Sequence, residues 1–425
     1  MRCLTGIVLI WLAVRLIGLA IGAEEPPIEW IDPDTGHRVV RLSKEPGSQS
    51  PYFHQNAFTP DGQWMVMSSP GGISVVNLRS REIKKLVTGF VRLIEVGRRT
   101  GDVYFVSNRV VYAVAVPAGT VREIARPPAR AGVATVNADE TLLAGSITER
   151  PTNAPSAFGE DGPPPEWWTR PRRPSLEQRF NRRWPMELFV LNIRTGEIKT
   201  FNRGSNWLNH IQFSPTDPTL LMFCHEGPWH LVDRIWTIRA DGSELSKIHT
   251  RTMVMEIAGH EFWSPDGATI WYDLQTPRGE VFWLAGYNIR TGERTWYNLQ
   301  RNEWSVHYNV SPDGRMFAGD GGDSDMVAQA PDGKWIYLFV PELVPNRMNP
   351  ADQKGLITTG VLRAERLVNM AKHDYSLEPN VRFTPDGKWV VFRANFHGPP
   401  HVYAVEIEKA ANSQAGSGSS TESAQ

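Results

Sequence analysis

The sequence predicts an all-β fold, a seven-bladed β-propeller, with six blades as the alternative, and two repeated motifs are the basis for this prediction. The first motif is an apolar residue, Ser or Thr, Pro, Asp and Gly, followed by alternating apolar residues. Pro-Asp-Gly favours a tight turn because Pro presets φ, Asp bonds its own backbone and Gly adopts positive φ. Copies begin at Phe58, Trp263, Val310 and Phe383, with degenerate copies at Phe213 and Val136.

The second motif is a strand, a Thr-Gly or Asp-Gly type turn and a returning strand. It begins at Val75, Val190, Thr237 and Tyr287. Together the two motifs give units of about four strands at intervals of roughly 40 to 60 residues, which is typical of propeller blades. We expect a single propeller domain over residues 24–409.

The two ends of the chain differ from this pattern. Residues 1–23 have a basic start, an apolar run and a small-residue end, as secretory signals do. Arg15 interrupts the apolar run, and a charge is costly at the bilayer centre, so a cleaved signal is favoured over an uncleaved anchor. We expect a periplasmic or secreted protein with no stable membrane insertion apart from the signal. The small polar residues of 410–425 predict a disordered tail.

Charge and cysteine content exclude some classes of function. The net charge of -1 gives no reason to expect nucleic acid as a partner. Cys3 lies in the signal, so Cys224 is alone in the remaining chain and no intramolecular disulfide is expected. Cys224 precedes His225 and could be a thiol nucleophile. A small buried strand residue is favoured, because free Cys is among the most buried residue types.

One segment lacks strand alternation. Residues 150–185 are rich in Pro, Arg and Trp, and long loops in compact folds are usually functional or disordered. We expect a loop insertion near the active-site mouth, in which Trp167 and Trp168 could stack on sugars. Arg182 and Arg183 are candidates for binding a substrate carboxylate. The alternative is a loop whose tryptophans only fix it to the propeller rim.

Histidines concentrate between Asn209 and Trp263 and also precede several repeat turns. Equivalent positions in successive units should surround the central channel, where imidazoles suit acid–base or metal chemistry. Neighbouring amides could hydrogen bond to sugar hydroxyls, although amides also pair strand ends in any propeller. The candidates are His54, Gln55, Asn209, His210, His225, His260 and His307.

Longer motifs carry a more specific signal. FCHEGPWHLVDRIW from Phe223, GHEFWSPDG from Gly259, YFHQNAFTPDG from Tyr52 and GDGGD from Gly319 resemble the oligogalacturonate lyases over nearly the whole chain after the signal. The resemblance implies a seven-bladed propeller that cleaves short polygalacturonate chains by β-elimination with a divalent metal. It also implies that His225, in HEGP, is the catalytic base, and that His260, in HEFW, binds the metal.

The chain departs from the family pattern before its last repeat turn. The segment HDYSLEPNVRFTPDG has Tyr375, Glu378 and Asn380 where the resemblance leads us to expect a glutamine and two histidines. Glu and Asn supply oxygen ligands, so we expect Glu378 and Asn380 to bind the metal with His260. Manganese is expected, with calcium or magnesium as alternatives, and His373 is an alternative ligand.

Eliminating the 4-O substituent of a uronate requires a base for the C5 proton and neutralisation of the adjacent carboxylate. A neutral histidine and a metal meet these needs. We therefore expect a lyase acting on oligogalacturonides from pectin. Two alternatives stay open. One is a non-catalytic propeller that binds a glycan or a protein, and the other is a lyase for another uronate polymer, such as ulvan or rhamnogalacturonan.

Overall fold

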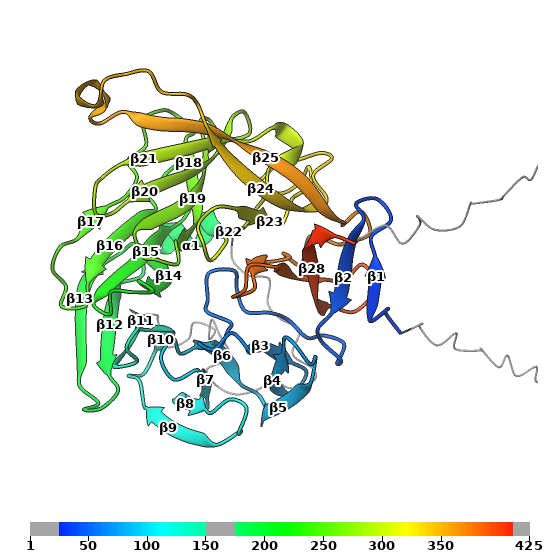
Figure 1. The fold of residues 1–425 in the computed structure, drawn as a ribbon. Helices are drawn as coiled ribbons and strands as arrows, with labels where there is room; N and C mark the ends of the chain where they lie inside the picture. The colour runs from blue at the N-terminus through cyan, green and yellow to red at the C-terminus, as the bar shows by residue number, and fades with distance from the viewer. Residues whose placement is uncertain (1–24, 150–174, 411–425) are drawn as a thin grey trace, which may run out of the picture.

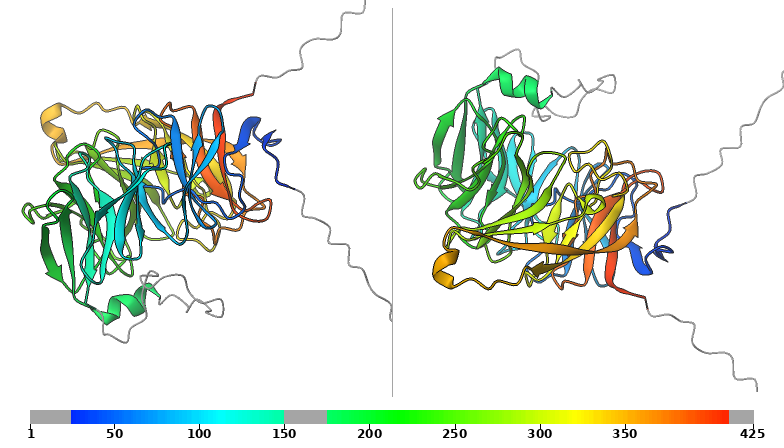
Figure 2. Two further views of the ribbon diagram at one scale, coloured as in Figure 1. Left: turned by 90° about the horizontal axis from the view of Figure 1, so that it is seen from below. Right: turned by 90° about the horizontal axis from the view of Figure 1, so that it is seen from above.

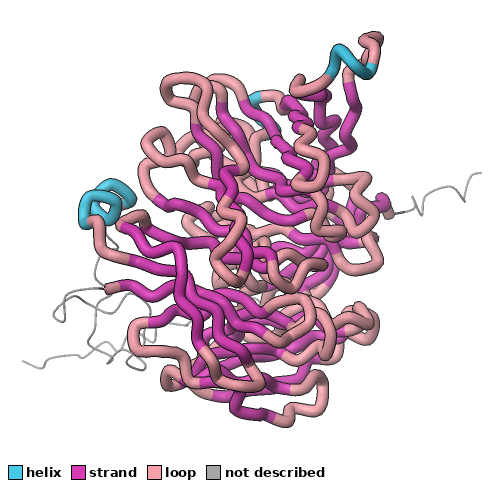
Figure 3. Tube along the Cα trace, turned by 90° about the vertical axis from the view of Figure 1, so that its left-hand side faces the viewer, coloured by secondary structure: helices cyan, strands magenta, loops and turns pink. Residues whose placement is uncertain are grey.

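The computed structural model describes residues 25–149 and 175–410. The signal segment, most of the predicted tail, and Trp167 and Trp168 lie outside the described residues. Strands arranged around a central axis form a disc (Figure 1), which confirms the predicted β-propeller. Within the described ranges, helix is limited to α1 (Leu176–Arg182) and the 3-10 turns η1 (Arg301–Glu303) and η2 (Pro350–Gln353), all at the periphery (Figure 3).

The strands follow one another as antiparallel units, each running from the channel outward. The first four units contain β3 (Trp64–Ser69), β4 (Gly72–Asn77) and β5 (Ile83–Thr88); β6 (Arg92–Val96), β7 (Val103–Ser107), β8 (Val110–Val114) and β9 (Val121–Ala125); β10 (Ala131–Val136), β11 (Leu142–Thr148), β12 (Met186–Asn192) and β13 (Ile198–Gly204); and β14 (Trp207–Phe213), β15 (Leu220–Glu226), β16 (Ile235–Arg239) and β17 (Ser246–Lys247).

The remaining units contain β18 (Ile257–Trp263), β19 (Thr269–Gln275), β20 (Phe282–Asn288) and β21 (Arg294–Asn298); β22 (Tyr308–Val310), β23 (Phe317–Gly319), β24 (Trp335–Leu343) and β25 (Ile357–Asn369); and β26 (Arg382–Phe383), β27 (Trp389–Ala394) and β28 (His401–Lys409) with β2 (His37–Arg41) and β1 (Glu29–Ile31). An eight-stranded sheet joins the fifth and sixth units, because β21 and β25 pair in parallel at their outer edges. Separating these two units gives seven, so we assign seven blades, numbered in this order.

Chain ends close the ring. β2 pairs with β28, so a strand from the start of the domain becomes an outer strand of blade 7 (Figure 1). In blade 1, a bridge between Phe58 and Met65 supplies the innermost pairing. The two termini of the domain therefore hold each other in place through backbone hydrogen bonds.

The repeat turns have the predicted chemistry. In the turn that follows Phe58, Asp61 Oδ1 accepts hydrogen bonds from Thr59 Oγ1 at 2.5 Å and from the Gln63 amide at 3.0 Å. Gly62 has a φ of 68°, which an L side chain rarely adopts. Because every such turn joins an inner strand to the next strand outward, all of them lie at one end of the channel, opposite the end where the inner strands begin.

The core lies between neighbouring blades, where β-branched and aromatic residues of facing sheets pack. Figure 2 shows the disc from its edge, with α1 standing out from one face. In the described part of the chain, no helix is long and apolar enough to cross a membrane.

Candidate functional site

A short segment, Tyr52–Gln55, enters the channel and divides it; we call it the plug. It closes on itself, since the Gln55 amide donates to the Tyr52 carbonyl and Gln55 Oε1 accepts from the Tyr52 amide, both at 2.9 Å. The buried Arg382 guanidinium donates to the carbonyls of Pro51, Tyr52 and Gln55. Burial, followed by the nearby Arg393, lowers the pKa of Arg382 to about 9. The plug therefore places its aromatic rings at fixed positions in the channel.

The Tyr52 ring lies beside the rings of three predicted histidines, one of which, His54, also belongs to the plug. The Tyr52 ring lies 5.1 Å from the ring of His54, 5.5 Å from that of His210 and 5.2 Å from that of His307, between centroids. The pKa of His54 is held well below its usual value by burial and then by His210. The structure thus brings His54, His210 and His307 together, as expected from their equivalent sequence positions.

Bulges direct two of the predicted histidines, His210 and His260. The pairing register shifts between Asn209 and Gln212 in β14, and between Gly259 and Phe262 in β18. His210 and His260 lie in these bulges with φ values of 47° and 44°. A bulge re-aims one side chain out of the alternating pattern, and histidine is among the residues that tolerate left-handed φ best.

Two buried carboxylates hold histidines in blades 5 and 6. Asp273 Oδ1 lies 2.9 Å from His260 Nδ1, and Asp320 Oδ2 lies 2.7 Å from His307 Nδ1. A carboxylate accepts hydrogen bonds, so both Nδ1 atoms carry the proton and each Nε2 keeps a lone pair while the ring is neutral. Burial lowers the pKa of His260, but the charge and hydrogen bond of Asp273 outweigh it and the pKa is raised.

Glu378 and Asn380 lie beside these histidines in the segment before β26. Glu378 Oε2 is 3.8 Å from His307 Nε2. Asn380 is fully buried: its Oδ1 accepts from the Phe53 amide at 3.1 Å, and its Nδ2 donates to the Glu378 carbonyl at 2.9 Å. The Asn380 side chain therefore also fastens the plug. His373 has both ring nitrogens engaged, with the Leu377 carbonyl and the Asn395 amide, so as an alternative metal ligand it would first have to break these contacts.

A buried ion network joins blades 4 and 5 at the same level, because Glu261 lies on β18. Arg234 NH1 donates to Glu226 at 2.6 Å, and its Nε donates to Glu261 at 2.9 Å. His210 Nε2 lies 3.2 Å from Glu226, and Asn209 Nδ2 donates to the same carboxylate. Burial opposes the charge on Arg234, but the two glutamates raise its pKa well above the usual value.

His225 lies apart from this network. It follows Cys224, which is fully buried as expected; neighbouring side chains on a strand point to opposite faces. The His225 ring is 5.0 Å from that of Trp236 and 5.6 Å from that of Phe223. Burial lowers the pKa of His225 to about 4, against a small opposing effect of Asp233. His225 is therefore neutral at neutral pH.

The helix α1 packs against Gly227, two residues after His225. A Cβ at Gly227 would lie 2.8 Å from Phe180 Cδ2 and 2.8 Å from Val232 Cγ1, so only glycine fits. Ser175 caps the helix with a capping box. The guanidinium of Arg183 lies 4.0 Å from the Phe180 ring and that of Arg182 lies 4.9 Å from the Trp184 ring, and both arginines are exposed.

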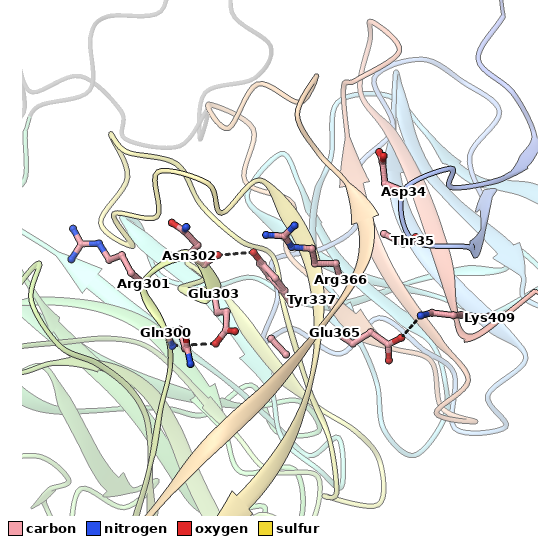
Figure 4. A pocket seen from close by; sticks show the side chains of 11 residues that line it. Asp34, Thr35, Gln300, Arg301, Asn302, Glu303, Tyr337, Glu365, Arg366 and Lys409 are labelled. Atoms are coloured by element: carbon pink, nitrogen blue, oxygen red, sulfur yellow. Dashed lines mark hydrogen bonds and ion pairs between the residues drawn. The ribbon is translucent and has the colours of Figure 1, made fainter.

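Two cavities offer alternative positions for the site. One of about 590 Å³ opens between blades 6 and 7 (Figure 4). Its lining contains no histidine, and two of its charges, Glu365 and Lys409, pair with each other at 3.1 Å. The other, of about 360 Å³, follows the channel from His54 and Gln55 towards the repeat turns. We place the site on the opposite side of the plug, where the histidines gather.

Sequence reasoning missed four side chains of this site: Tyr52, Asp273, Asp320 and Arg234. One signal was present, because His260–Asp273 and His307–Asp320 have the same spacing of 13 residues. That spacing places Asp273 on β19 and Asp320 directly after β23, beside the histidine in each blade. Tyr52 and Arg234 gave no such signal.

The donor types fit a divalent metal. His260 and His307 are oriented through Nδ1, as metal-binding histidines usually are, and Glu378 supplies carboxylate oxygens. Within the described residues, a single group of three such side chains has its ligand atoms within 4.8 Å of one another, namely His210, Cys224 and Glu226. In that group, the Glu226 carboxylate is already paired with the Arg234 guanidinium.

Known proteins share these features. A family model described as oligogalacturonate lyase matches residues 176–411, more than half of the chain. The oligogalacturonate lyase of Dickeya dadantii (strain 3937) is 26% identical over 400 residues, covering 88% of this chain and 95% of that protein. The oligogalacturonide lyase of Pectobacterium atrosepticum is 29% identical over 225 residues, 52% of this chain and 55% of the relative.

Solved structures agree on the fold. An oligogalacturonate lyase in complex with manganese superposes with a TM-score of 0.69 at 22% identity, covering 90% of this chain and 96% of the other. An oligogalacturonate lyase from Vibrio parahaemolyticus gives a TM-score of 0.67 at 21% identity, with the same coverage. The match of the family model over residues 176–411 shows that the chain belongs to the oligogalacturonate lyase family.

Proposed function

We propose that the protein is a lyase that cleaves short uronate oligosaccharides, most specifically oligogalacturonides, by metal-assisted β-elimination. The observation that carries the proposal is the family match, because residues 176–411 include the HEGP motif, the HEFW motif and the segment before the last repeat turn. The named relatives support the substrate class.

His225 is the proposed base. A general base must be unprotonated at the working pH, and the lowered pKa of about 4 keeps this imidazole neutral. The aromatic rings of Phe223 and Trp236 limit its access to water. His225 would take the C5 proton of the sugar at the cleavage site, while the C4–O bond breaks and a C4–C5 double bond forms.

The residue types for a metal are also present. The expected ligand set is His260, Glu378 and Asn380, and the manganese complex of the structural neighbour supports a divalent ion, with calcium or magnesium as alternatives. When bound, the ion would neutralise the uronate carboxylate and make the C5 proton more acidic. Asp273 orients His260 for this role through its hydrogen bond to Nδ1.

Further residues are proposed to contact the substrate. His54, His210 and His307 surround Tyr52 in the channel, and Arg182 and Arg183 are exposed on and beside α1 near Gly227. A guanidinium binds a carboxylate through two parallel hydrogen bonds. The amides of Gln55 and Asn209 are engaged with the plug and with Glu226, so we assign them a supporting role.

We also propose that residues 1–23 direct export and are removed, leaving a periplasmic or secreted propeller with a loop insertion at 150–185. The basic start, apolar run and small-residue end of the first segment support export. N-terminal sequencing of the protein from a periplasmic or culture fraction tests this proposal. A retained Met1 in that fraction would contradict it.

Product formation tests the activity. The protein is incubated with digalacturonate and trigalacturonate, with Mn²⁺ or with a chelator, and the ultraviolet absorbance of the unsaturated uronate is followed. We expect a rise that depends on the metal. No product from these substrates or from other uronides, together with retained sugar binding, would favour the binding propeller instead.

A further inference from the structure

The repeat turns surround one end of the channel, and blade 2 differs from the other blades there. In blade 1 the Thr59 amide donates to the Trp64 carbonyl across the turn, and in blade 2 the Gly97 amide donates to the Asp102 carbonyl in the same way. The residue after this donor is therefore equivalent in successive blades. In blade order, these residues are Pro60, Arg98, Ala138, Pro215, Pro265, Pro312 and Pro385. Blade 2 has the charged residue of this ring.

The neighbouring blade holds the blade 2 turn in place. Glu140, between β10 and β11 of blade 3, accepts hydrogen bonds from the Arg99 and Thr100 amides, both at 2.7 Å, and from Thr100 Oγ1 at 2.6 Å. A Cβ at Gly97 would lie 2.5 Å from the carboxylate carbon of Glu140, so this close approach requires glycine. These contacts fix the backbone on both sides of Arg98 without using its side chain.

Arg98 lines the cavity of about 360 Å³ that lies between the plug and the repeat turns. It is exposed, yet the surrounding channel walls lower its pKa, against an opposing effect of Glu95. The Glu95 carboxylate is itself used by Thr135 Oγ1 at 2.6 Å and by the Val136 amide at 2.8 Å. Among the described residues, Arg98 has no hydrogen-bond or ion-pair partner. Its guanidinium is therefore accessible to a ligand from the channel.

A second arginine adds positive charge to the same cavity. Arg382 is 3% exposed and donates to backbone carbonyls of the plug segment, and in the described part of the chain it forms no ion pair. Two arginines and one carboxylate, Glu95, line the cavity, so one positive charge is left without a counterion. Because an unpaired charge is costly in a protein interior, an anion bound in the cavity would be stabilised.

The walls of the cavity limit the kind of anion. Prolines of the repeat turns and aromatic side chains form most of the lining, and the aromatic ones are Phe53, Phe58, Phe213, Phe262, Trp263 and Phe383. Small-molecule sites are mostly apolar, with few polar groups and volumes of roughly 300–1,000 Å³. The cavity is near the lower limit of this range, so it suits a ligand of about monosaccharide size.

Two amides supply the remaining polar groups. Asn309 Oδ1 accepts from the Phe383 amide at 3.0 Å, and Gln212 Nε2 donates to the Glu261 carbonyl at 2.9 Å. In the described ranges, Asn309 Nδ2 and Gln212 Oε1 have no hydrogen-bond partner. They leave one donor and one acceptor in the cavity, as recognition of hydroxyl groups requires.

We propose that the channel between the plug and the repeat turns is a second binding site, for a monosaccharide acid, in which Arg98 binds the carboxylate. A guanidinium can bind a carboxylate through two parallel hydrogen bonds. The amides contact the hydroxyl groups, and the apolar walls contact the sugar ring. This site goes beyond the proposed function, because the plug separates it from the histidines and no bond of the ligand is broken there.

Calorimetric titration of the full chain with galacturonate, in the presence of a chelator, tests the proposal. We expect saturable binding in the wild type and an affinity lower by about 10- to 100-fold in Arg98→Ala, because that variant loses a charged hydrogen-bond donor. Arg99→Ala is the matched control: it removes the same charge from the same turn, outside the cavity lining, and should leave the affinity as it was.

Arg98→Lys keeps the charge without the planar donor pair, so its affinity should lie between those of the wild type and Arg98→Ala. Circular dichroism confirms that each variant is folded. Equal affinity in the wild type and in Arg98→Ala, or an equal loss in Arg99→Ala, would overturn the proposal.

Two further ligands test the chemical class. Galactose has no carboxylate and benzoate has no hydroxyl groups, so both should bind at least about 10-fold more weakly than galacturonate. Galactose binding as tightly as galacturonate would overturn the role of Arg98, and benzoate binding as tightly would overturn the assignment to a sugar acid.

Turnover of trigalacturonate by the same variants separates this site from the proposed activity. We expect Arg98→Ala to keep the wild-type turnover. Lyase activity without galacturonate binding that depends on Arg98 would overturn this inference alone. Galacturonate binding that depends on Arg98, in a protein that cleaves no uronide, would refute the proposed lyase alone.

Discussion

Blade 4 and blades 5–6 use histidine in different ways. In blades 5 and 6, Asp273 and Asp320 hold His260 and His307 through Nδ1, and Asp273 raises the pKa of His260. In blade 4, His225 is on the second strand between aromatic rings, and its pKa is lowered to about 4. One environment suits a metal ligand and the other suits a base that stays neutral.

The largest expected effect is on the buried ion network of Arg234, which joins blades 4 and 5. Arg234→Met leaves Glu226 and Glu261 buried without a cation, so the free energy of unfolding should fall by about 3–5 kcal/mol. Denaturant unfolding measures this. Arg239, which is partly exposed at the end of β16 and pairs with Asp217 and Glu244, is the matched control, and Arg239→Met should cost less than about 1 kcal/mol. Equal losses in the two variants would contradict the account.

The second prediction concerns the pH dependence of kcat/KM. A base must be deprotonated, so kcat/KM should hold until the pH falls to about 4, the pKa of His225, and then drop tenfold per pH unit. An unperturbed histidine would give this limb near 6.5. The free protein's unfolding is followed over the same pH range to separate acid denaturation. A limb near 6.5 in a folded protein would assign the base elsewhere.

The third prediction concerns the affinity of His260 in blade 5 for the metal. Asp273→Asn weakens the orientation of His260, and loss of such a partner lowers metal affinity by about 10–100-fold. Calorimetric titration with Mn²⁺ measures the change. Glu256→Gln makes the same kind of change at the carboxylate of His249 and should leave the affinity as it was. Unchanged affinity in Asp273→Asn would remove His260 from the metal site.

The smallest effect concerns the contact between α1 and blade 4. Gly227→Ala places a methyl group 2.8 Å from the Phe180 ring and should destabilise the fold by about 1–3 kcal/mol. Gly204→Ala is the control, because nothing lies within 4 Å of its added carbon. Adding Phe180→Leu should recover part of the loss. If Gly227→Ala costs no more than the control, α1 is not seated on Gly227 in solution.

Local chemistry explains what the sequence could predict. The repeat turns depend on four adjacent residues, and Asp61 and Gly62 make the contacts and the φ angle expected of them. The inner positions of His54, His210 and His307 followed from their offset to these turns. The match of the family model also confirms the resemblance of the sequence motifs to the oligogalacturonate lyases.

The missing parts depend on contacts between distant residues. The bulges at His210 and His260 arise from pairing register, which a single strand does not encode. Arg382 reaches plug residues more than 300 positions away, so neither partner signals the other in the sequence. Asn380 could be named as an oxygen donor, but its bond to Phe53 appears only in the folded chain.

A paired measurement on His225→Ala and His260→Ala tests the division of labour between the blades most directly. Turnover of trigalacturonate and Mn²⁺ affinity are measured for both variants. We predict that His225→Ala lowers kcat by about 10²–10⁴-fold with unchanged Mn²⁺ affinity, whereas His260→Ala weakens Mn²⁺ binding. Near-normal kcat in His225→Ala, or weakened Mn²⁺ binding in that variant, would contradict the assignment of blade 4 to the base and of blades 5 and 6 to the metal.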